Sequence, residues 1–148
     1  MRLHNTAEHA IRTMVQVASQ PPDQITQISE ISSKQDVPES ILRKIIASLL
    51  KHGLIYSSRE NGEGVVLKRP VNEITILDII EAIEGEIYLN ECLVGPDYCD
   101  RIPQCPVHLV WQEIRDATND ISREKTIEKL VYKSINYCQY HVSLSALK

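Results

Sequence analysis

The sequence of 148 residues predicts a mainly α protein with a small two-stranded wing: a winged helix-turn-helix followed by a long dimerisation helix. Three observations predict this class. Two short helical segments flank a tight turn, two strand-like segments follow, and a long amphipathic segment lies nearer the C-terminus. The core must be mainly Ile, Leu and Val, because the chain has no Phe and one Trp.

The first helix is predicted over residues 5–19, where apolar residues recur at helical spacing. A short helix should follow Thr26, whose hydroxyl suits an N-cap, and should end in a turn over 35–37. The next helix begins at Pro38 and ends near Gly53, as proline and glycine favour. This pair of helices has the shape of a helix-turn-helix.

The strand-like segments are 54–58 and 65–68, which form a wing that must lean on the helices, since an isolated hairpin is marginal. Further helices are predicted over 74–84, about 107–122 and 126–137. Little else in the chain remains to cover the helix at 107–122. We therefore expect it to pack on a second copy of itself, giving a homodimer.

We divide the chain into a DNA-binding domain (1–85), a ligand loop (86–106) and a dimerisation and C-terminal segment (107–148). The net charge is −4, but residues 1–70 carry nine basic and seven acidic side chains. Residues 71–148 carry seven and thirteen. A mildly basic front half suits a protein that offers one face to a polyanion.

The sequence argues against several classes of protein. No apolar run has membrane-spanning length, and no signal peptide is recognisable, so we expect a cytoplasmic protein without a membrane partner. No phosphate-binding loop and no nucleophile with a spaced base is present, so the sequence predicts no enzyme.

Four potential metal ligands lie within 17 residues, at the spacing Cys-x6-Cys-x5-Cys-x2-His. Proline and glycine between them predict a loop, which can fold several thiolates onto one point. In a reducing compartment such a cluster favours a metal or redox site over disulfides. Zinc also accepts this donor set. The four residues are Cys92, Cys99, Cys105 and His108.

The second helix of the helix-turn-helix carries Ser40, Arg43 and Lys44, which we expect to face DNA. Arg43 could pair bidentately with guanine, whereas Lys44 suits a phosphate. Arg59 near the wing tip suits a narrow minor groove, and Lys68 suits a phosphate.

Five short segments, together with the order of the elements, point to one family. They are Met1-Arg2-Leu3, Leu50-Lys51-His52-Gly53-Leu54, Arg69-Pro70, Glu73-Ile74-Thr75-Ile76-Leu77-Asp78 and the cysteine loop ending in His108-Leu109-Val110-Trp111. Over about residues 1–130 the chain resembles the Rrf-two family of bacterial transcription regulators. Its members include the iron–sulfur cluster regulator and the nitric-oxide-sensitive repressor.

The resemblance implies a dimeric repressor that binds a double-stranded DNA operator and holds one iron–sulfur cluster, 2Fe–2S or 4Fe–4S, per subunit. It implies that Cys92, Cys99 and Cys105 are cluster ligands. The fourth ligand would be His108 or, from the partner subunit, Glu8. The cluster would sense redox state, nitric oxide, oxygen or cluster supply.

Two further residues join the expected DNA contacts: Arg2 in the first family segment and Thr26 at the start of the helix-turn-helix. The wing departs from the usual family pattern Arg-x-x-Gly-Gly-Gly-Tyr, and Glu63 places an anion near the DNA. Cys138 falls outside the family pattern and is expected to be a plain apolar residue.

Two alternatives remain open. The first is a cluster-free, thiol- or zinc-dependent regulator of sulfur metabolism. The second is a small iron–sulfur redox protein, which would not need Arg43, Lys44 and Arg59 on one face.

Overall fold

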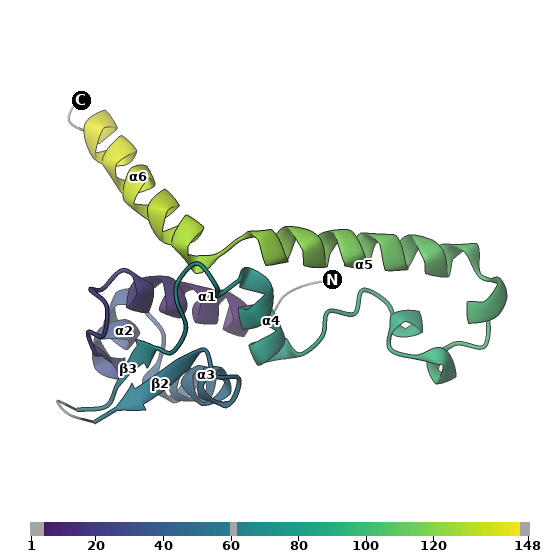
Figure 1. Ribbon diagram of the computed structural model, residues 1–148, viewed down its shortest axis with the longest axis horizontal. Helices are drawn as coiled ribbons and strands as arrows, with labels where there is room; N and C mark the ends of the chain where they lie inside the picture. Colours follow the sequence, from purple (N-terminus) through teal and green to yellow (C-terminus); the bar gives the residue numbers. More distant parts are fainter. Residues whose placement is uncertain (1–4, 60–61, 146–148) are drawn as a thin grey trace.

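A helical domain with a small sheet lies at one end of the molecule, and a long helix extends from it (Figure 1). The computed structural model describes residues 5–59 and 62–145, without the side chains at 103 and 137–145. Within these ranges no helix is both long and apolar enough to span a membrane.

The elements follow the predicted order, with one additional strand. They are α1 (Asn5–Ala18), β1 (Thr26–Gln27), α2 (Ile28–Gln35), α3 (Glu39–Lys51), β2 (Ile55–Ser58), β3 (Gly64–Leu67), α4 (Ile76–Glu84), η1 (Glu91–Leu93), η2 (Pro96–Tyr98), η3 (Ile102–Gln104), α5 (Pro106–Glu124) and α6 (Ile127–Ser145). The last helix continues beyond its expected end at 137.

Helix α1 lies at the centre of the helical domain, where it packs on α3, α4 and the start of α6. The core is aliphatic, as the composition requires. Its fully buried side chains include Met14 from α1, Leu42 and Leu49 from α3, Ile79 from α4 and Ile127 from α6. Because one face of α3 is held in this core, its opposite face must meet solvent.

The sheet has three antiparallel strands in the order β1-β3-β2, not the two that we expected. The expected N-cap role of Thr26 is wrong, because Thr26 lies in β1 opposite Val65 and α2 begins only at Ile28. The strands approach closely at Gly64, where a Cβ atom would lie 2.3 Å from Ile25 Cγ2. Pairing with β3 therefore keeps Thr26 extended.

Helix α4 begins with a capping box formed by Thr75 and Asp78. The Thr75 hydroxyl accepts from the Asp78 amide at 3.1 Å, and the Thr75 amide donates to the Asp78 carboxylate at 2.8 Å. Each side chain satisfies a backbone amide that the helix itself leaves unpaired. Gly85 ends the helix at a positive φ of 81°.

Replacing Thr75 by alanine should lower the free energy of unfolding by about 1 kcal/mol, because the first turn of α4 loses its side-chain acceptor. Urea denaturation at a fixed protein concentration measures this change. Ser33→Ala, at an exposed position on α2, is the control and should stay within about 0.5 kcal/mol of the unaltered protein. Equal effects of both substitutions would contradict the capping role.

The junction between α5 and α6 is fixed to the segment that precedes α4. The Ile127 amide donates to the Ile74 carbonyl at 2.9 Å, and the Ile76 amide donates to the Lys125 carbonyl at 2.8 Å. Ile127 is also fully buried in the core. One end of α5 is thus held by the helical domain, although we had assigned the whole region after 106 to a separate segment.

Candidate metal centre and DNA interface

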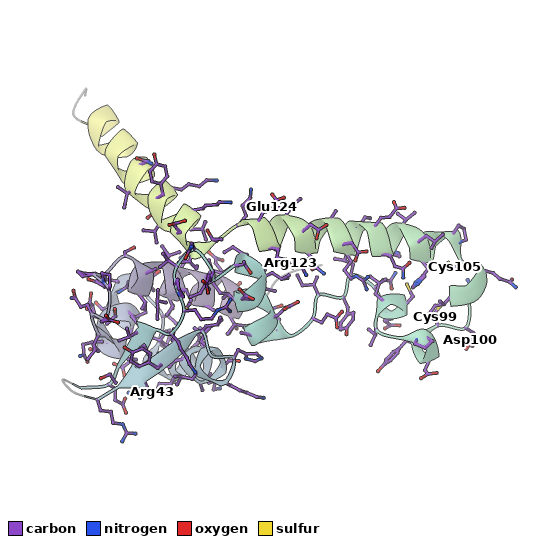
Figure 2. All side chains as sticks on the ribbon, viewed as in Figure 1. Arg43, Cys99, Asp100, Cys105, Arg123 and Glu124 are labelled. Carbon is purple, nitrogen blue, oxygen red and sulfur yellow. The ribbon has the colours of Figure 1, made fainter. Side chains whose placement is uncertain are left out.

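The cysteine loop lies at the end of α5 that is far from the helical domain. Figure 2 shows Cys99 and Cys105 there, beside the first turn of α5. Three short 3-10 helices shape the loop, with Cys92 inside η1, Cys99 directly after η2 and Cys105 directly after η3. Tight turns of this kind can bring the three cysteines of the loop close to one another.

One cavity of about 180 Å³ is lined by the three cysteines and His108, together with Trp111. All three thiols are free and partly buried. Among the residues that the structure describes, no three His, Cys, Asp or Glu side chains are already arranged around a single ion. The loop therefore gathers the predicted thiols around one space.

His108 enters this space from the first turn of α5. Its backbone amide donates to the Cys105 carbonyl at 3.2 Å. Its Nδ1 atom is buried and has no hydrogen-bond partner among the residues that the structure describes. A buried ring nitrogen without a partner costs free energy, so this atom is suited to take a ligand.

Glu8, the other predicted fourth ligand, lies on α1 and accepts from Arg12 at 2.5 Å. Helix α1 is at the opposite end of α5 from the cysteine loop (Figure 1). Within one subunit the structure does not bring Glu8 to the thiols. Cys138 lies on α6, but its side chain is outside those described.

A second group of predicted residues lies on the surface formed by α3 and the wing. Ser40, Arg43 and Lys44 are exposed on α3 because Leu42 and Ile45 point into the core. Figure 2 shows Arg43 on the outside of the domain near the wing strands. The geometry of α2, the turn and α3 therefore presents the predicted polar face of a helix-turn-helix.

The wing residues Arg59 and Lys68 are also exposed and form no ion pair among the described residues, and the same holds for Lys44. Thr26 differs, because it pairs with Val65 in β1 and is only 1% exposed in the single subunit. The expected DNA contact of Thr26 stays a prediction. Arg2 lies outside the described residues.

Arg43, which we expect to face DNA, is held by two carboxylates in this structure. Its guanidinium donates to the Glu63 carboxylate of the wing and, at 3.2 Å, to Glu39 one turn earlier on α3. Hydrogen bonding to Glu63 is the main reason that the pKa of Arg43 is raised above its usual value. The anion at position 63 was visible in the sequence, but its pairing with a residue twenty positions away was not.

The profile of the Rrf2 family, described as iron-dependent transcriptional regulators, matches residues 3–133. The chain belongs to the Rrf2 family. Rrf2 proteins are DNA-binding transcription regulators, so the chain is a regulator of this type and not an enzyme. This confirms the resemblance and excludes the small redox protein as its class.

Among Rrf2-type relatives, the HTH-type transcriptional regulator IscR of Pectobacterium carotovorum is 28% identical over 131 residues, which are 88% of this chain and 79% of the relative. The solved structure of T. potens IscR has a TM-score of 0.71 at 19% identity, and the match covers 90% of this chain and 88% of the T. potens chain. Oxidised CymR from Staphylococcus aureus has a TM-score of 0.71 at 23% identity, covering 88% and 96%. These structures confirm the winged-helix fold.

Proposed function

We propose that this Rrf2 regulator is a homodimeric repressor whose affinity for operator DNA is controlled by an iron–sulfur cluster. The observation that carries the proposal is the cavity shared by the three loop thiols and the unpartnered His108 nitrogen. Thiolate and imidazole donors fit such a cluster, and its 2Fe–2S and 4Fe–4S forms are both held mainly by cysteine.

In this proposal the cluster is held by four residues, which are Cys92, Cys99, Cys105 and His108. The bound cluster would supply iron that reacts with nitric oxide and oxygen. Trp111 also lines the cavity, beside the proposed ligands. We favour His108 over Glu8 because it already lines the cavity, whereas Glu8 is paired with Arg12 on a distant helix.

The dimer in this proposal forms through α5. No described side chain of α5 is buried within the subunit. Apolar residues recur along it at alternating spacings of three and four, which is the spacing of a coiled-coil seam. This seam consists of Val107, Val110, Ile114, Ala117 and Ile121, all exposed in the single subunit.

Helix α5 also provides the connection between the cluster loop and the DNA-binding domain. Its 19 residues span about 28 Å. The loop joins it at Cys105, and the junction near Ile127 fixes its other end to the core. If closure of the ligands around the cluster favours one placement of the two α3 helices, DNA binding and cluster binding are coupled. Each then changes the affinity of the other by the same factor.

Anaerobic purification tests the proposal directly. The expected product is brown, absorbs visible light and contains iron and acid-labile sulfide in comparable amounts. Exposure to nitric oxide or air should bleach it and change its operator affinity in a gel-shift assay. A colourless protein containing zinc would contradict the cluster.

Single substitutions at the two predicted fourth ligands should differ in effect. His108→Ala should lower cluster stability by roughly 10–100-fold, measured as the rate of bleaching in air, because it removes a donor from the cavity. Glu8→Ala should leave that rate unchanged, since Glu8 pairs locally with Arg12. The reverse pattern would place the fourth ligand on the partner subunit.

One alternative is supported by the donor set itself. Three cysteines and one histidine also form a closed tetrahedral zinc site, and three free thiols can act as a redox switch without metal. Under this alternative the protein would be a zinc- or thiol-dependent regulator of sulfur metabolism. Metal analysis of the anaerobic protein separates it from the cluster.

A further inference from the structure

We propose that Glu63 of the wing is a specificity-determining residue, whose carboxylate competes with DNA for the Arg43 guanidinium and so disfavours sites that offer Arg43 no guanine. The inference concerns the DNA interface and depends on the DNA binding of the family. It does not depend on the metal centre.

The contacts at this interface form a triad of one cation and two anions. Arg43 binds Glu63 and Glu39 together, and all three side chains are about half exposed. A groove of about 200 Å³ between α3 and the wing is lined by Arg43, Glu63 and Arg59. The local charge of the triad is therefore negative on the face that meets a polyanion.

The backbone holds Glu63 in place beside α3. Its carbonyl accepts from the Ile28 amide at 2.9 Å, at the start of α2. The next residue, Gly64, pairs with Gln27 on one side and Ser58 on the other. Arg43 is equally constrained, because the inner face of α3 is buried. The ion pair thus joins two fixed elements.

Folding does not require this pair, since exposed ion pairs contribute at most about 1 kcal/mol. Its larger effect is on binding. A phosphate that takes Arg43 leaves Glu63 unpaired beside a polyanion, which is unfavourable. The binding of the protein to DNA of arbitrary sequence is therefore weakened.

A G·C pair can satisfy both partners at once. Guanine presents two acceptors to an arginine, and cytosine presents an amino donor to a carboxylate. An A·T pair offers no two adjacent acceptors for the guanidinium. The Arg43–Glu63 pair should therefore select a G·C pair beneath α3 more strictly than Arg43 alone would.

Glu63→Gln tests this inference, because glutamine keeps the shape and one acceptor but removes the charge. The probes are an operator duplex selected in vitro with the unaltered full-length protein and a random duplex of equal length. We expect the affinity for the random duplex to rise roughly tenfold more than that for the operator. The salt dependence for the random duplex should steepen by about one unit.

Two controls define the result. Asp120→Asn removes a carboxylate from an exposed ion pair with Arg123 on α5 and should leave the specificity ratio unchanged. In an Arg43→Ala background, Glu63→Gln should change that ratio much less than in the unaltered protein, because no guanidinium remains for Glu63 and DNA to compete for. An unchanged ratio in the single variant, or an equal loss of specificity in the Arg43→Ala background, would overturn the inference.

Discussion

Replacing Cys99 by serine should yield a colourless, folded protein after anaerobic purification. Serine supplies no thiolate, and the proposed centre has only three cysteine ligands in its cavity. Because even outer partners of a metal site are worth roughly 10–100-fold in affinity, we expect a loss of cluster affinity greater than about 100-fold. Iron and sulfide content, with visible absorption, measures this loss.

The matched control is Cys138→Ser, which changes the cysteine on α6 outside the loop and should leave the iron content unchanged. Cys99 is only partly buried and is not part of the hydrophobic core, so its substitution should alter the free energy of unfolding by less than about 0.5 kcal/mol. A brown Cys99→Ser protein with full iron content would remove Cys99 from the ligand set.

Replacing Ile114 by glutamate should convert the proposed α5 dimer to monomers and abolish operator binding at concentrations at which the unaltered protein binds. Ile114 lies at the middle of the seam on α5 and is 44% exposed in the single subunit. In a dimer two carboxylates would be buried without partners, which costs several kcal/mol and weakens association by roughly 100-fold or more. Light scattering and gel-shift assays measure both effects.

Ser122→Glu places the same charge on α5 beside the seam rather than in it, and should preserve the dimer. The far-ultraviolet circular dichroism of both variants should match that of the unaltered protein, because neither position lies in the core. A dimeric Ile114→Glu protein would show that α5 is not the interface and that the exposed apolar seam has another partner.

The helices could be predicted closely because their signals are local. The apolar spacing and the Pro38 start both lie within one or two turns of the elements that they define. The cysteine loop could be predicted equally well, because its ligands and its turn-forming prolines lie in one short segment of the chain. Membership of the Rrf2 family could be inferred from five short sequence segments, one of which is the cysteine loop.

Long-range pairing could not be predicted in this way. Thr26 resembled an N-cap, but β3 holds it in a strand because Gly64 allows the chains to approach closely. Local capping preference loses to a sheet that also buries the residue. The burial of Ile127 in the helical domain was likewise unseen, because its partners lie near residue 74.

The sequence by itself determined the family, the helix-turn-helix and the three cysteines with His108, because spacing along the chain sets which side chains share a helix face or a loop. Only the tertiary structure decided that Arg43 is held by Glu63, that Thr26 is buried, and that His108 rather than Glu8 lines the thiol cavity. The physical reason is that each of these facts depends on the packing of elements far apart in sequence, which local spacing does not specify.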